Sequence, residues 1–72
     1  MNTIMTNNKI LTMRETEILQ LIADGNTDRE IAALLSLSAK TINTHRKNML
    51  RKLNLKNTAL LIRHALENKI VK

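Results

Sequence analysis

The chain has 72 residues and no Cys, Pro, Phe, Tyr or Trp, which predicts one small domain with a core of Leu, Ile, Met and Ala and excludes disulfides and thiolate metal sites. Its formal net charge of +6 is unevenly spread: residues 1–30 carry three basic and five acidic residues, whereas residues 31–72 carry nine basic residues and one acid, Glu67. This asymmetry favours a polyanionic partner, and the absence of a nucleophile–base pair, a metal-ligand cluster and a phosphate-binding glycine loop argues against an enzyme or a cofactor.

The N-terminal segment, residues 1–9, is expected to be a mobile tail in front of a domain that spans residues 10–72. The segment lacks the basic head and apolar run of a signal peptide. No stretch of the chain approaches the roughly 18 consecutive apolar residues of a membrane span. We therefore expect a soluble, cytoplasmic protein without a membrane partner.

Two capping boxes mark the starts of the first two helices. In Thr12–Glu15 and in Thr27–Glu30, a Thr precedes a Glu by three positions, directly before an apolar run with helical spacing. These patterns predict a first helix over 13–24, ended by Gly25 in a left-handed conformation, and a second helix over 28–35.

Two further caps predict the remaining helices. Ser38 begins a third helix over 39–53, and Asn57 begins a fourth over 58–68. A short helix, a turn of about three residues and a longer basic helix follow the order of a helix-turn-helix. The predicted fold is an all-α four-helix bundle that contains this motif. The residues expected in its core are Ile18, Leu19, Leu21, Ile22, Ile31, Ala32, Leu35, Ile42, Met49, Leu53, Leu61 and Ala65.

The third helix separates into an apolar face and a polar face. At 100° per residue, Met49 and Leu53 fall within about 20° of Ile42 and define the core side. The opposite side, spanning about 100° to 200°, contains no acid. Its members are Lys40, Asn43, Thr44, Lys47 and Arg51. Asn can bond an adenine edge, Lys can donate to guanine, and a Thr methyl can contact thymine, so this face suits base reading in a major groove.

Position along the third helix divides these residues by role. Base readers lie in the N-terminal half, which favours Asn43, Thr44, Lys47 and Lys40, whereas Arg51 lies further along and is expected at a phosphate. Arg46 lies at the margin of the core stripe and is expected to send its guanidinium toward a phosphate. His45 lies on a flank, where packing with one satisfied hydrogen bond is expected, and no second ligand nearby supports a metal site.

The fourth helix has an apolar stripe broader than one core contact needs. Leu61 and Ala65 centre the edge that is expected to pack inside the domain. The other edge is assigned to a homodimer surface. Its residues are Ala59, Ile62, Arg63 and Leu66. Because such a patch is small, we expect dimerisation mainly on DNA.

An ordered set of short motifs runs from Leu11 to Val71. The motifs are Leu11–Leu19, Gly25–Thr27, Glu30–Ala32, Leu37–Ser38, Thr41–Ile42 followed by His45, and Lys52–Leu53. Their order and spacing resemble those of LuxR/GerE/FixJ-type helix-turn-helix domains. The resemblance implies a four-helix DNA-binding domain of a bacterial transcription regulator, whose third helix enters the major groove and whose fourth helix supports a homodimer on two half-sites.

The resemblance also implies roles for single residues. It places Asn43, Thr44 and Lys47 at base-contacting positions. The positions that it implies for backbone or mixed contacts are Lys40, Thr41, His45, Arg46 and, through backbone amides, Asn26 and Thr27. Thr41 is equally suited to packing.

The sequence departs from the family pattern at three positions. Asp28 stands where Asn is frequent, and its carboxylate would repel a nearby phosphate. Asn43 replaces a frequent Lys, which suggests a different base preference, and Thr58 replaces a frequent Arg. Most members carry a receiver or ligand-sensing domain ahead of this region, so the layout resembles either a small stand-alone GerE-type regulator or an excised domain.

Other functions remain open from the sequence. A sigma-factor promoter-reading region has a similar opening, although His45 and the ending Lys52–Leu55 fit it less well. RNA or single-strand binding modules use aromatic stacking, which this chain cannot supply. A helical interaction module, an adaptor or anti-activator that never touches DNA, is the alternative from another class. RNA polymerase or a regulatory partner protein is a further candidate partner.

Overall fold

The computed structural model describes residues 10–72, so the expected tail at residues 1–9 lies outside the described residues. Within the described range the chain is all-helical, without a strand. The helices bounded there are α2 (Met13–Ala23), α3 (Asp28–Leu35), α4 (Ala39–Leu53) and α5 (Thr58–Glu67). The predicted all-α fold is confirmed, and each helix end agrees with its prediction within one residue.

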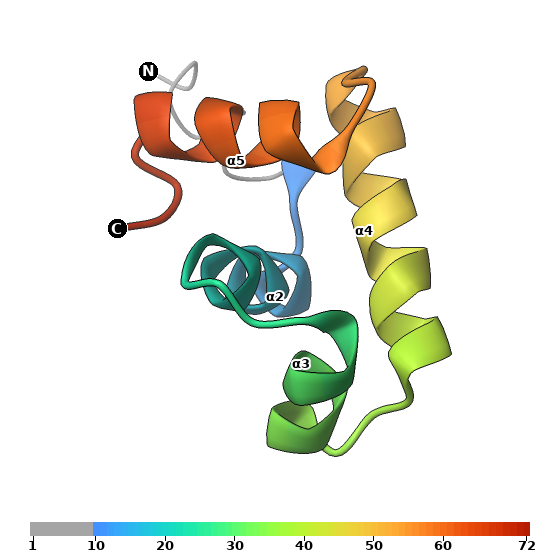
Figure 1. Ribbon diagram of the computed structural model, residues 1–72. Helices are drawn as coiled ribbons and strands as arrows, with labels where there is room; N and C mark the ends of the chain where they lie inside the picture. Colours follow the sequence, from blue (N-terminus) through green and yellow to red (C-terminus); the bar gives the residue numbers. More distant parts are fainter. Residues whose placement is uncertain (1–9) are drawn as a thin grey trace.

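Helix α2 lies at the centre of the arrangement and contacts α3, α4 and α5. In Figure 1, the long α4 runs along one side of the domain, α3 packs at one of its ends and α5 lies across the other. The connection from α3 to α4 is the short segment of residues 36–38, as a helix-turn-helix requires. The side of α4 opposite to its contacts with α2, α3 and α5 faces away from these helices (Figure 1).

Each helix begins at the cap that the sequence indicates. The Thr12 and Thr27 hydroxyls accept from the Glu15 and Glu30 amides at 3.0 and 3.1 Å, and the two carboxylates accept in return from the cap amides. Ser38 caps α4 by accepting from the Thr41 amide, and Asn57 caps α5. These bonds satisfy amides that have no acceptor inside the helix.

All four helices end in the same way. After each one a residue takes a left-handed conformation: Gly25, Ser36, Asn54 and Lys69. The amide of the next residue then bonds the carbonyl five positions back, as in Asn26 to Leu21 at 3.1 Å and Leu37 to Ala32 at 2.8 Å. This is the Schellman pattern. After α3, α4 and α5 the donor is an apolar residue that packs against the core: Leu37, Leu55 and Ile70.

The core is aliphatic and centred on α2. Fully buried side chains come from every helix of the described range: Ile18, Leu19, Ile31, Ile42, Met49 and Leu61. Of the residues predicted to be in the core, Leu21, Leu35 and Leu53 are only partly buried and pack at its edge. Their lower burial follows from the small size of the domain, which leaves the edges of each apolar stripe near the surface.

One carboxylate lies inside this core. Glu15 is 3% exposed, and its Oε1 accepts from the Thr12 amide at 2.9 Å and from Lys52 Nζ at 2.7 Å. Burial alone would raise the pKa of Glu15, but the hydrogen bonds and the charge of Lys52 outweigh it, so this pKa lies below the ordinary 4.5. The cap of α2 is thereby tied to the last turn of α4, a contact that the sequence analysis did not predict.

We expect Glu15→Gln to lower the free energy of unfolding at pH 7 by about 1–3 kcal/mol, a range reduced because Lys52 is partly exposed. Because the folded-state pKa of Glu15 is depressed, its stabilisation is complete above the unfolded-state pKa and is lost as the pH falls through the lower folded-state value. Urea unfolding of wild type and variant from pH 7 to pH 3 should therefore show a difference that shrinks with acid. Glu17→Gln, at an exposed surface pair, is the control and should show no comparable difference.

We expect Gly25→Ala to destabilise the domain by about 1–2 kcal/mol, because φ is 96° at this residue and a Cβ disfavours that conformation. An added Cβ would meet no atom within 4 Å, so the cost is one of backbone conformation alone. Thermal unfolding measures it. Ser36→Ala is the matched control, since Ser36 is already a left-handed residue with a Cβ; an equal loss in both variants would contradict the explanation.

Candidate nucleic-acid interface

The two faces of α4 are separated as the helical spacing predicts. Ile42 and Met49 are completely buried against the rest of the domain. On the opposite face Lys40, Thr44, Lys47 and Arg51 are exposed and Asn43 is half-buried. No acidic residue lies on α4, so this outer face is both free and positively charged.

Hydrogen bonds on the outer face limit what two side chains can offer. The Thr44 hydroxyl donates to the Lys40 carbonyl at 3.0 Å, so its proton is already used and it presents a methyl group and acceptor lone pairs. Arg51 donates to Asn48 one turn earlier on the same helix. For Lys40 and Lys47, no ion pair is present within residues 10–72, so both ammonium groups can meet an external acceptor.

Arg46 lies between α4 and α3 and is already bonded. Its Nη1 donates to Oδ1 of Asp28 at 2.8 Å, and the two side chains are 23% and 26% exposed. The sequence predicted that the Arg46 guanidinium points toward a phosphate, and it did not predict that Asp28 binds this group. Asp28 and Arg46 are 18 positions apart, so no helical periodicity in the sequence could have indicated that they pair. Only their opposite charges are consistent with a pair at the level of sequence.

Thr41 and His45 flank the outer face and are half-buried. The Thr41 hydroxyl shares a 2.9 Å hydrogen bond with the Ser38 hydroxyl, so it takes part in the cap of α4. Nδ1 of His45 is buried and has no hydrogen-bond partner among the described residues. The imidazole therefore packs as expected, but the expected hydrogen bond is not made by Nδ1.

In the turn before α3, the two backbone amides that were expected to contact a phosphate already donate hydrogen bonds within the domain. The Asn26 amide donates to the Leu21 carbonyl at 3.1 Å, and the Thr27 amide donates to the Glu30 carboxylate at 2.7 Å. The Asn26 side chain also bonds the Leu21 carbonyl. At the start of α3, the Asp28 and Arg29 amides have no acceptor inside the helix and take no part in the capping box.

The surface assigned to a second subunit forms one stripe of α5. Leu61 and Ala65 are fully buried, which confirms the core edge of this helix. Along the other edge Ala59 and Arg63 are exposed and Leu66 is 51% exposed. Ile62 is partly buried at the border. Arg63 pairs with Glu67 at 3.1 Å in a solvent-exposed ion pair.

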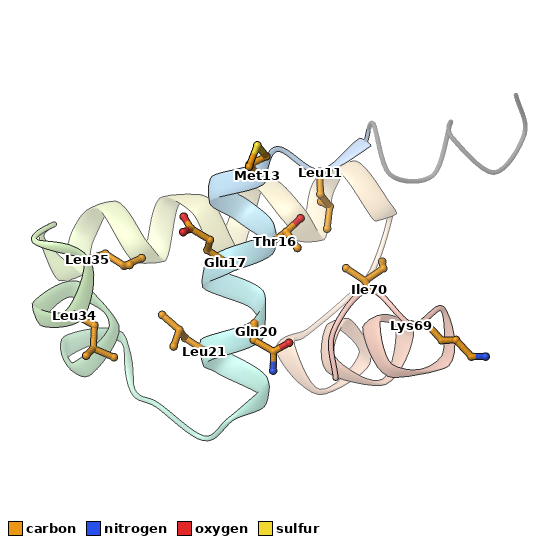
Figure 2. A pocket seen from close by; sticks show the side chains of 10 residues that line it. All are labelled: Leu11, Met13, Thr16, Glu17, Gln20, Leu21, Leu34, Leu35, Lys69 and Ile70. Atoms are coloured by element: carbon orange, nitrogen blue, oxygen red, sulfur yellow. The ribbon is translucent and has the colours of Figure 1, made fainter.

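An apolar groove of about 780 Å³ lies away from this interface. Its side chains come from α2 and the segment just before it, from α3 and from the segment after α5 (Figure 2), and none comes from α4. Met13 and Leu34, at 87% and 62% exposure, line it. A molecule in the groove would therefore leave the outer face of α4 free.

Nowhere in residues 10–72 do three His, Cys, Asp or Glu side chains come together in a way that could hold a metal ion. None of the helices in this range has the length and apolar character needed to cross a membrane.

Comparison with known proteins finds a family whose model matches most of the chain. A family model described as "Bacterial regulatory proteins, luxR family" (GerE) matches residues 9–65, which include α2, α3, α4 and most of α5. The match therefore covers the whole helix-turn-helix, together with α2 and most of α5.

Individual relatives are response regulators and other regulatory proteins. The chain is 57% identical over 56 residues to the uncharacterized response regulatory protein YgeK of Escherichia coli, an alignment covering 78% of this chain and 38% of the relative. It is 49% identical over 61 residues to the transcriptional regulatory protein MctR of Rhizobium johnstonii, covering 85% and 28%. With the oxygen regulatory protein NreC of Staphylococcus carnosus it shares 44% over 63 residues, covering 88% and 29%. The chain thus spans between about a quarter and two fifths of the length of these relatives.

Proposed function

The chain belongs to the luxR family of bacterial regulatory proteins and is a DNA-binding transcription-regulator domain, and on this premise we propose that it regulates transcription by sequence-specific binding of double-stranded DNA with α4 in the major groove. The observation that carries the proposal is the exposed, acid-free and basic outer face of α4. A helix of this width fits the major groove, where base edges are distinguishable. The proposal implies the bacterial cytoplasm as its location and involves no catalysis.

Base contacts are assigned to the N-terminal half of α4. Asn43 suits a two-point contact with adenine, and Lys47 and Lys40 suit the O6 and N7 acceptors of guanine. Because the Thr44 proton is bonded within the helix, this residue is expected to contact a thymine methyl or accept a hydrogen bond.

Backbone contacts surround this reading surface. Arg51 lies further along α4 and is assigned to a phosphate. Three further contacts are proposed from side chains of α4: the Thr41 hydroxyl, the His45 ring nitrogen other than the buried Nδ1, and the N–H groups of Arg46 that do not bond Asp28. The last proposed phosphate contact is the turn at Asn26 and Thr27. At that turn both amides are occupied, so the exposed Thr27 side chain and the following α3 amides are the groups available.

A homodimer on two half-sites is proposed through the exposed stripe of α5. The stripe offers Leu66, part of Ile62 and the stem of Arg63, which is less apolar area than a stable free dimer requires. DNA would therefore supply the remaining free energy by holding two copies side by side. RNA polymerase or a regulatory partner protein remains a further proposed partner.

Family membership favours DNA binding over the interaction module that the sequence left open. An adaptor that never touches DNA would not need an acid-free basic face opposite the core side of α4. A gel shift at low salt separates the two, since the adaptor would retain no duplex.

We expect Lys47→Ala and Asn43→Ala to relax preference at one or two base pairs, at a cost of about 1–3 kcal/mol on the preferred site. Arg51→Ala should weaken binding to all sequences alike and reduce the salt dependence by about one phosphate contact. Selection of bound duplexes from a random pool at two salt concentrations measures both effects. If all three variants lowered binding uniformly, the assignment of base readers would be wrong.

The proposed dimer predicts half-sites whose centres lie about 10 base pairs apart, one turn of the duplex. Leu66→Glu should abolish paired occupancy of such a duplex but leave binding to a single half-site intact, since Leu66 lies outside the core. Sedimentation of the free protein should show a monomer at low micromolar concentration. A stable free dimer, or a variant that still fills both half-sites, would oppose the proposal.

A further inference from the structure

The ion pair between Asp28 and Arg46 is unlike the short-range pairs of the described residues. Arg14–Glu17 and Arg63–Glu67 join neighbours on one helix and are largely exposed. Asp28–Arg46 instead joins the first residue of α3 to the middle of α4, at 2.8 Å and with each side chain about three-quarters buried. Its geometry is therefore maintained by the packing of two helices.

The pair lies next to the proposed DNA face. Arg46 follows Asn43 by three positions and therefore neighbours it on the surface of α4. It directly precedes Lys47. Asp28 lies at the start of α3, the helix that crosses the DNA backbone in a helix-turn-helix complex. A phosphate near this corner would meet both members of the pair.

The carboxylate changes what the guanidinium can contribute. An uncompensated Arg attracts a phosphate and displaces a counterion, which raises affinity for any duplex. A carboxylate 2.8 Å away cancels most of that attraction at longer range. On the outer face, by contrast, Lys40 and Lys47 have no acidic partner within the described residues. Arg46, at the middle of α4, thus differs from these two lysines because a carboxylate of the same domain neutralises its charge.

We propose that Asp28 limits the DNA affinity of this domain by competing with a phosphate for Arg46. Asp28 thereby sets the sequence-independent part of binding and its salt dependence, while base preference stays with the outer face of α4. The inference rests on the proposed function. The sequence predicted that Asp28 repels a phosphate directly. Here the acid acts through its partner Arg46, and it lowers the affinity for every DNA sequence equally.

The test is Asp28→Asn, which removes the charge but retains a side-chain oxygen that can accept from Arg46. Fluorescence anisotropy is measured with a labelled duplex chosen by selection and with a scrambled duplex, at 50, 100 and 200 mM KCl. We expect the variant to bind both duplexes about threefold to tenfold more tightly per subunit at 100 mM salt. Its plot of log affinity against log salt should be steeper by about 0.9 per subunit, the value for one further phosphate contact.

Three other variants complete the experiment. Glu17→Gln makes the same charge change at an exposed pair on the groove side and should bind as wild type does. Arg46→Met should weaken both duplexes. Asp28→Asn should not bring its threefold to tenfold gain in that background, because the acid acts through Arg46, so the double variant should bind no more tightly than wild type does. Circular dichroism melts of each variant identify any loss of folding. If Arg46→Met unfolds, the affinity of the double variant, which leaves no unpaired charge, takes its place in the comparison.

The outcomes are distinct. Weaker or unchanged binding by Asp28→Asn would overturn the inference and make Asp28 a positioning residue for Arg46. Tighter binding to the selected duplex alone would overturn it as well, and so would equal tightening by Glu17→Gln. If wild type bound neither duplex at 50 mM salt, the proposed function itself would fail.

Discussion

The burial of Ile42 and Met49 on α4 is the contact on which the rest of the structure depends. Both side chains are completely buried, and in a helix this orientation directs the residues half a turn away into solvent. The same packing that stabilises the domain therefore presents Lys40, Asn43, Thr44, Lys47 and Arg51 as one surface. In this protein the candidate interface is a consequence of the core.

A core without aromatic residues needs support at its edges. Each aliphatic side chain contributes about 1.5–3 kcal/mol when fully buried, and a domain of this size has few of them. The chain adds hydrogen bonds at every helix end and the buried Glu15 carboxylate, which serves the cap of α2 and the Lys52 ammonium together. One charged group thus stabilises a helix start and the docking of a second helix.

The two long-range ion pairs found among residues 10–72 lie at different parts of α4. Lys52, in its last turn, is held to α2, whereas Arg46, near its middle, is held to α3. Both orient the helix relative to its neighbours. They differ in what they do to the surface, because only the second neutralises a cation beside the residues proposed to read DNA. In the proposed complex, docking of the helices and electrostatic attraction to DNA would therefore be coupled at that corner.

The sequence by itself determined the local features of this protein. Caps and apolar spacing act over three or four residues, so Thr12, Thr27, Ser38 and Asn57 correctly indicated the helix starts, and the spacing of Ile42 and Met49 correctly indicated the free face of α4. Tertiary structure decided what depends on distant partners. The Glu15–Lys52 and Asp28–Arg46 contacts join residues 37 and 18 positions apart. After the left-handed residues Ser36, Asn54 and Lys69 the next residue is apolar and packs against the core, a contact that exists only once the core has formed.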